Sequence, residues 1–206
     1  DERLSHDALE GIYSTVILRD IMQRVPQCNQ YTLEKIIRFL CSNIGSISSP
    51  NRIANVLSSE RELERRCSIA NRTVDKYIEY IEKAYFFFSV GRYDIKGKDL
   101  LRTLEKYYII DIGFRHLLLG YRDVDRAHLL ENIVYIELLR RHYRVCIGKI
   151  GELEVDFVAE NSRQKIYIQV TESMMSDETR QRELKPLKSI PDNYEKIVLS
   201  MDRDFI

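Results

Sequence analysis

The chain has 206 residues, and its 32 basic and 32 acidic side chains give a formal net charge of zero, so no global field draws it onto nucleic acid. Its hydrophobic content of 44% is ordinary for a globular protein, and no apolar run approaches the roughly 20 residues that cross a bilayer. These numbers argue against a membrane-spanning protein and confine any nucleic-acid contact to a local patch.

The four cysteines are scattered along the chain, at Cys28, Cys41, Cys67 and Cys146, without a CxxC pair or histidines at ligand spacing. We therefore expect reduced thiols in a cytoplasmic protein. No secretory signal peptide precedes the first helical pattern. Both ends of the sequence fall inside segments with structured patterns, which favours a fragment of a longer polypeptide.

The first part of the chain has the periodicity of helices. Apolar residues recur at helical spacing over residues 7–25 and again over residues 32–43. Pro26 ends the first run, and Gly45 ends the second. Thr32 is the expected N-cap of the second helix, since its hydroxyl can accept a hydrogen bond from the first turn.

A helix-turn-helix followed by a hairpin is predicted next. A short helix over residues 50–57 precedes a longer helix that Asn71 is expected to cap. The β-prone segments at residues 85–90 and 100–110 then flank a turn region at residues 91–97. A hairpin in this position predicts a winged helix.

The pattern changes after two further helices, at residues 112–119 and 127–141. Three β-rich runs, a charged helix and a fourth β-rich run follow, at residues 143–147, 152–158, 166–170, 176–188 and 196–200. The order helix, three strands, helix, strand predicts an α/β sandwich over a mixed sheet.

The predicted fold class is therefore α+β, with a helical winged-helix domain followed by an α/β sandwich. Residues 1–30 are expected to be a helical lead-in from a missing N-terminal module. Residues 31–110 form the winged helix-turn-helix domain, and residues 111–206 form the sandwich domain. The boundary between these two domains is expected near residues 105–122.

The sandwich domain contains a constellation of polar residues typical of a metal site. Side chains alternate across a strand, so Glu154 and Asp156 are expected on one face, with Val155 and Phe157 on the other. Gln169 on the next strand should then lie beside Asp156. With Glu131 on the preceding helix, these groups would offer oxygen ligands to Mg²⁺, and Asp156 and Gln169 are the candidate metal ligands.

This spacing resembles the PD-(D/E)xK nuclease superfamily, which has a restriction-endonuclease-like fold. Asp156 matches the Asp of the motif, Gln169 its second acid, Thr171 its lysine and Glu131 the helix glutamate. The resemblance implies that two acids hold the metal and that the lysine positions or activates the attacking water. Because QVT replaces ExK here, one carboxylate and one cation are missing, and the site is expected to be catalytically vestigial.

Two other interpretations of these residues remain open. Hydrolysis could persist if a relocated cation, Lys149 or Lys165, moved into the site. Asp156 could instead have a purely structural role, as a helix or strand cap or in an ion pair with a neighbour such as Lys149. Gln169 would then only satisfy hydrogen-bonding groups at the edge of its strand.

Longer segments carry a closer resemblance. They are GIYSTVILRDI at residues 11–21, YIIDIGFRHLLLG at 108–120, LLENIVYIELLRR at 129–141, IGKIGELEVDFVAE at 147–160 and KIYIQVT at 165–171. Together they resemble the C-terminal half of a prokaryotic family of AAA-type P-loop ATPases that carry a domain of unknown function. The resemblance implies ATP binding only in the missing N-terminal module, since GRYDIKGKD at residues 91–99 fails as a Walker A motif.

A local basic patch is expected on the winged helix. The candidate nucleic-acid contacts are Arg72, Thr73 and Lys76 on the helix, with Arg92, Lys96 and Lys98 in the wing. Asp75 and Glu79 lie on the same helix and favour protein docking as the alternative.

The sequence thus favours a DNA- or partner-binding regulatory segment of a prokaryotic ATPase, without activity of its own and with homo-oligomerisation through the full-length ATPase. A Mg²⁺-dependent DNA nuclease and a purely structural dimerisation or docking module are the two alternatives. No cofactor is expected to be resident, and Mg²⁺ would bind only weakly.

Overall fold

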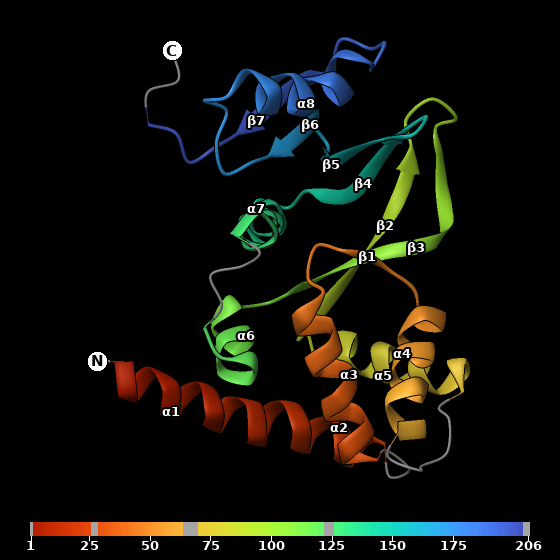
Figure 1. Ribbon diagram of the computed structural model, residues 1–206, viewed down its shortest axis with the longest axis vertical. Coiled ribbons are helices and arrows are strands. Elements are labelled where there is room, and N and C mark those ends of the chain that lie inside the picture. Colours follow the sequence, from red (N-terminus) through yellow and green to blue (C-terminus); the bar gives the residue numbers. More distant parts are fainter. Residues whose placement is uncertain (1, 26–28, 64–69, 122–125, 204–206) are drawn as a thin grey trace. The chain divides into compact units, whose positions relative to one another are not determined.

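The computed structural model describes residues 2–25, 29–63, 70–121 and 126–203 (Figure 1). The chain forms two compact units, one made of Asp1–Ser89 and Tyr107–Arg122, and the other of Val90–Lys106 and Asp123–Ile206. The chain passes from one unit to the other three times, whereas the sequence predicts a single domain boundary between residues 105 and 122. In the described part of the chain, no helix is long and apolar enough to cross a membrane.

The first unit begins with one continuous helical run, as the periodicity predicts. It consists of α1 (Glu2–Ile12), a π-helix (Tyr13–Leu18) and α2 (Arg19–Arg24). A π-helical segment widens the turn, and here the Ser14 hydroxyl donates to the Glu10 carbonyl at 2.9 Å, a side-chain bond that competes with the backbone ladder.

Helices and one short strand form the rest of the first unit, namely α3 (Gln30–Ser42), β1 (Ile47–Ser48), α4 (Pro50–Leu63), α5 (Asn71–Lys83) and α6 (Ile112–Leu119). Their apolar stripes form a core that includes Leu33, Ile36, Ile37, Leu40, Ile53, Val74, Ile81, Phe86 and Phe114. The helix at residues 112–119 was predicted with these limits, and the Asp111 side chain caps it by accepting from the Gly113 amide at 2.7 Å.

Two expected helix caps are wrong. The side chain of Asn29, not Thr32, caps α3, and it accepts from the Thr32 amide at 3.0 Å. The N-cap of α5 is Ala70, which offers no side-chain acceptor, and Asn71 is already helical. In both cases the residue that we expected to be the N-cap lies within the first turn of the helix.

The second unit contains most of a mixed sheet. Its strands are β2 (Phe87–Asp94) and β3 (Asp99–Ile109), which both continue into the first unit, and β4 (Arg144–Ile150), β5 (Leu153–Glu160), β6 (Lys165–Val170) and β7 (Glu195–Leu199). With β1, the strand order is β1-β3-β2-β4-β5-β6-β7. The pairs β2–β4 and β6–β7 are parallel, whereas β4–β5 and β5–β6 are antiparallel.

The β2–β3 hairpin is therefore part of this sheet rather than a projecting wing. Arg92 of β2 lies in register with Ile147 of β4, and the Ile95 amide donates to the Lys149 carbonyl at 2.9 Å. Parallel pairing with β4 ties residues 90–106 to the second unit, a long-range contact that local patterns along the sequence do not reveal.

Helices cover both faces of this sheet. On one face, Tyr167 packs in a cluster with Leu187 and Ile190 at the end of α8 (Asp177–Lys188). On the other, Ile166 and Ile168 lie beside side chains of α7 (Arg126–Arg140). Since neighbouring residues of a strand face opposite sides, α7 and α8 lie on opposite faces. The fold class is α+β with a mixed sheet, as predicted.

A β-bulge interrupts the alternation in β5. The β4–β5 register shifts between Cys146 and Gly148, so that Asp156 and Phe157 of β5 together lie opposite the single residue Ile147 of β4. Val155 consequently packs in the cluster under α8, while Phe157 stacks near Tyr135 of α7, with 6.1 Å between ring centroids. The expectation that Val155 and Phe157 share a face is wrong, because a strict period of two does not survive the extra residue.

Candidate functional site

A buried lysine lies at the centre of the second unit's polar cluster. Lys106 on β3 is 4% exposed, and its Nζ lies 3.2 Å from Oε2 of Glu131 on α7 and 2.8 Å from Oε1 of Glu154 on β5. One ammonium group thus bridges two carboxylates from different elements. Pairing of this kind is what permits charged groups to be buried.

Asp156 and Gln169 lie side by side, as the sequence predicts, and their side chains continue the hydrogen bonding of the β5–β6 ladder. Oδ2 of Asp156 accepts from the Val170 amide at 2.7 Å. Oε1 of Gln169 accepts from the Asp156 amide at 3.4 Å, and its Nε2 donates to Oε2 of Glu183 on α8 at 3.0 Å. Gln169 therefore links the strand to a further buried carboxylate, and Glu183 is a residue that the sequence analysis missed.

The electrostatics of the cluster distinguish its acids. Burial raises the pKa of Asp156 to about 7, and the nearby charge of Glu131 adds to this, with the Lys106 ammonium and the Val170 amide opposing. Burial alone would raise the pKa of Glu131, but the hydrogen bond with His128 and the charge of Lys106 outweigh it and lower the pKa. Near neutral pH, Glu131 is thus ionised and Asp156 is close to its midpoint.

The same carboxylates keep Lys106 charged. Burial acts to lower the pKa of Lys106, but the charges of Glu131, Glu154 and Asp156 together exceed this effect and raise it. The ammonium ion is therefore present throughout the physiological range, and it offsets part of the negative charge of these acids.

His128 is a second residue next to this cluster. It precedes Glu131 by one helical turn, and its Nδ1 lies 3.6 Å from Oε1 of Glu131. The sequence analysis did not connect the two, although a separation of three residues places side chains on the same face of a helix.

Of the other candidates for the missing lysine, Thr171 and Lys165 have contacts elsewhere, whereas Lys149 lies in register with an acid of the cluster. The hydroxyl of Thr171, at the position of the motif lysine, donates to the Ser173 carbonyl at 3.3 Å. Lys149 lies opposite Glu154 in the β4–β5 register. Nζ of Lys165 lies over the ring of Tyr93, 4.8 Å from its centroid. Lys106 instead reaches the carboxylates, and its position in a buried run of β3, before Tyr107, Tyr108 and Ile109, is the signal that could have identified it.

The donor set fits a Mg²⁺ ion poorly. One oxygen each of Glu131 and Glu154 is paired with Lys106, one oxygen of Asp156 accepts from a backbone amide, and the Gln169 carbonyl accepts from another. Mg²⁺ requires near-octahedral oxygen coordination and retains several waters. A metal would therefore have to displace Lys106 before it could use these carboxylates.

The predicted nucleic-acid contacts divide between the two units. Arg72, Thr73 and Lys76 are exposed on α5 in the first unit. In the second unit, Arg92 is half-buried on β2, and Lys96 and Lys98 are exposed in the turn before β3. The Asp94 side chain holds this turn by accepting from the Lys96 amide at 3.0 Å and the Gly97 amide at 3.2 Å.

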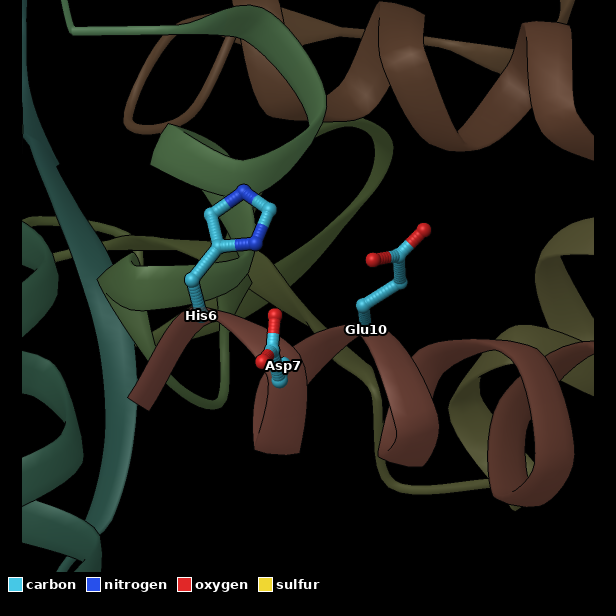
Figure 2. A group of neighbouring side chains, drawn as sticks. All are labelled: His6, Asp7 and Glu10. Carbon is cyan, nitrogen blue, oxygen red and sulfur yellow. The ribbon is translucent and has the colours of Figure 1, made fainter. Parts of the chain in front are cut away.

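A separate cluster of possible metal ligands lies on α1. His6, Asp7 and Glu10 are exposed, and one ligand atom from each lies within 4.8 Å of the others (Figure 2). Two of them, His6 and Glu10, are four residues apart and so share a helix face. Exposed acidic groups commonly gather in this way without an ion, and the buried cluster around Lys106 has the more specific geometry.

Comparison with known proteins gives a family and relatives without a stated activity. A Haemophilus influenzae protein named "Uncharacterized protein" is 38% identical over 200 residues, covering 97% of this chain and 48% of the relative. A Methanocaldococcus jannaschii protein, "Uncharacterized protein MJ1544", is 25% identical over 208 residues, covering 99% of this chain and 43% of the relative. This chain thus spans about half the length of these relatives.

No solved structure matches the chain. The profile of a family described as "Domain of unknown function (DUF8612)" matches residues 1–125, which is more than half of the sequence. Neither that description nor the names of the two relatives mention an ATPase or a nuclease. The chain belongs to the DUF8612 family.

Proposed function

We propose that this chain is a DNA-binding regulatory region of a larger ATPase, and that its second unit is a nuclease-like domain in which Lys106 replaces the metal ion. The observation that carries the proposal is the buried ion pairing of Lys106 with Glu131 and Glu154. A nuclease-like site whose acids are neutralised by the protein's own cation keeps its shape without the Lewis acid that hydrolysis requires.

The loss of two motif residues points the same way. Gln169 brings no charge, and the Thr171 hydroxyl is bound to the backbone. Because Asp156 has a pKa of about 7, it adds only part of a negative charge at neutral pH. A divalent cation would meet a site whose negative charge Lys106 already offsets in part, which leaves less attraction to compensate for its dehydration.

DNA binding is proposed for α5, acting as the recognition helix of a helix-turn-helix. Arg72, Thr73 and Lys76 are exposed along one stretch of this helix, where they could reach phosphates and base edges in a groove. The ATPase context follows from the sequence resemblance, and it is compatible with the fraction of each relative that lies outside the matched region. Homo-oligomerisation would come from that larger protein.

A Mg²⁺-dependent nuclease is the second candidate. The position of Lys106 beside Glu154 and near Asp156 favours it, since a relocated lysine could orient a water molecule as the motif lysine does. A structural docking module without nucleic-acid binding is the third candidate, and the acidic residues Asp75 and Glu79 on α5 favour it.

The variant Lys106→Met separates the first two candidates, because they predict opposite effects. If Lys106 replaces the metal, the parent chain should neither cleave DNA nor bind Mg²⁺ or Mn²⁺ at this site, and Lys106→Met should gain metal binding by the freed carboxylates. If the chain is a nuclease, the parent should cleave DNA with Mg²⁺, and both Lys106→Met and Asp156→Asn should lose cleavage.

Lys196→Met is the matched control, since it removes a half-buried lysine from β7 whose ammonium donates to the Asp192 carbonyl rather than to the cluster. Metal binding is measured by calorimetry and by the shift in thermal unfolding, and cleavage is measured on single- and double-stranded DNA. Metal-dependent cleavage by the parent that disappears in Asp156→Asn would overturn the metal-free proposal.

A further inference from the structure

A second polar surface lies at the other end of strands β4, β5 and β6. It consists of two depressions, of about 710 Å³ and 620 Å³, that share Arg144 and Glu160 in their linings. The first also contains Arg163, and the second contains Lys98, Lys165 and Tyr93. Because the linings share two residues, the depressions form one continuous surface, which we call the Arg144 groove.

The Arg144 groove has an excess of positive charge. Arg144 pairs in register with Glu160, and Glu160 pairs with Lys165, so one carboxylate lies between two cations across three strands. Lys98 and Arg163 add two more cations, against the single further carboxylate of Asp99. Arg141 also lines the groove, but Glu137 already neutralises it at 2.6 Å. This local excess contrasts with the zero net charge of the chain.

The backbone holds Arg163 in a defined place. The side chain of Asn161 accepts from the amides of Arg163 at 2.9 Å and Gln164 at 3.0 Å, and the Asn161 amide donates to the Gln164 carbonyl at 3.0 Å. These bonds fix the turn between β5 and β6. The backbone position of Arg163 is therefore fixed, beside the depression that Arg144 also lines.

An aromatic ring lies next to the cations. Tyr93 is half-buried on β2 and lines the second depression, with Nζ of Lys165 lying 4.8 Å from the ring centroid. Rings beside a track of cations are how proteins bind single-stranded nucleic acid, since an unpaired base stacks on the ring while phosphates contact the cations. A duplex offers no unpaired base for such a ring.

We propose that the Arg144 groove binds single-stranded nucleic acid, with phosphates at Arg144, Arg163 and Lys98 and a base that takes the place of the Lys165 ammonium over the Tyr93 ring. This inference rests on the nucleic-acid binding proposed above but not on the metal-free state of the Lys106 cluster. Asp156 and Glu160 are four residues apart on β5, or about 13 Å at the rise of a strand. A bound strand could therefore extend from the groove towards that cluster.

The test is fluorescence anisotropy of the whole chain with a labelled oligo(dT) of about 15 nucleotides, a length that fills a typical single-strand site. The double variant Arg144→Ala plus Arg163→Ala should weaken binding and lower the slope of log affinity against log salt by about 1.4, which corresponds to two lost phosphate contacts. Tyr93→Leu keeps an apolar side chain in the core, and it should weaken binding about tenfold without changing the slope.

Lys185→Ala plus Lys188→Ala is the matched control, because it removes the same charge from exposed positions of α8 in the same unit. This control should leave binding nearly unchanged. An equal loss in the control and in the groove variant, or a duplex that competes as well as a single strand, would overturn the inference.

The α5 variant Arg72→Ala plus Lys76→Ala distinguishes a failure here from a failure of the proposed function. If this variant alone loses DNA binding, α5 remains the contact and the groove inference fails. If the parent binds neither single-stranded nor duplex DNA, both proposals fail.

Discussion

Each of the two units buries a cationic side chain, but the partners differ. Arg115 of α6 in the first unit is 1% exposed, and its Nε donates to the backbone carbonyl of Cys41 on α3 at 3.1 Å. Lys106 in the second unit is instead paired with the carboxylates of Glu131 and Glu154. The first arrangement links two helices, whereas the second offsets the charge of buried acids at the site for which we propose that Lys106 replaces a metal ion.

The contrast shows that burial of a charge does not by itself indicate a functional site. In the hydrogen bond from Arg115 to the Cys41 carbonyl the acceptor is uncharged, so breaking this bond leaves no buried charge on the acceptor. An ammonium between carboxylates has charged partners, and its removal leaves negative charge in a buried place. The two units should therefore respond differently to loss of the cation, to pH and to metal ions.

The largest expected effect is the loss of the buried cations. Lys106→Met should destabilise the second unit by about 3–5 kcal/mol, because it leaves buried carboxylates without their counter-charge. Arg115→Met should destabilise the first unit less, by about 1.5–3 kcal/mol, the range for a charged hydrogen bond. Urea unfolding of both variants measures the difference.

Adding Glu131→Gln to Lys106→Met provides the control for this comparison. The second change removes one of the uncompensated charges, so it should recover part of the lost stability. If the double variant is no more stable than Lys106→Met, the lysine acts by packing rather than by charge, and the contrast between the two units fails.

A smaller effect is expected from pH. The pKa of Asp156 rises from its ordinary value of 3.8 to about 7 on folding, so between these values the folded chain holds a proton that the unfolded chain has lost. Stability from this group is present at low pH and disappears as pH rises through about 7, by at most roughly 4 kcal/mol. Glu131, whose pKa is lowered, acts in the opposite direction, and its contribution is lost only in acid.

Asp156→Asn tests this dependence because it keeps an oxygen that can accept from the Val170 amide while removing the charge. Relative to the parent, the variant should become progressively more stable from about pH 4 to pH 7, with a constant difference above pH 7, as measured by urea unfolding at several pH values. Parallel pH profiles for the two proteins would show that Asp156 does not titrate in this range.

The elements of the fold were largely predictable, because their periodicities are local. The helix over residues 112–119 was found with the predicted limits, and the expected strands near residues 152–158 and 166–170 became Leu153–Glu160 and Lys165–Val170. The adjacency of Asp156 and Gln169 was also predicted. The β5–β6 register is regular from Glu160 to Phe157, and the two residues are the next pair along it.

The central residue of the site was not predictable in the same way. Lys106 precedes Glu131 by 25 residues and lies on a strand that the sequence analysis placed in a different domain. The parallel pairing of β2 with β4 brings that hairpin into the second unit's sheet, and such a long-range pairing leaves no periodic pattern in the sequence. The bulge in β5 could not be predicted either, because it depends on how β5 pairs with β4. Gly148 is the residue that marks its position, since a Cβ there would lie 2.9 Å from Cβ of Val155.

The smallest expected effect tests the first unit through a helix cap. Asn29→Ala removes the side-chain acceptor of the Thr32 amide and should destabilise the chain by about 1 kcal/mol, whereas Asn29→Ser keeps an acceptor and should cost only a few tenths. Urea unfolding measures both variants. Because the cap lies in the first unit, Asn29→Ala should leave the pH profile of Asp156 and the metal response of Lys106→Met unchanged. A shift in either would mean that the two units unfold as one and that the buried cations cannot be compared independently.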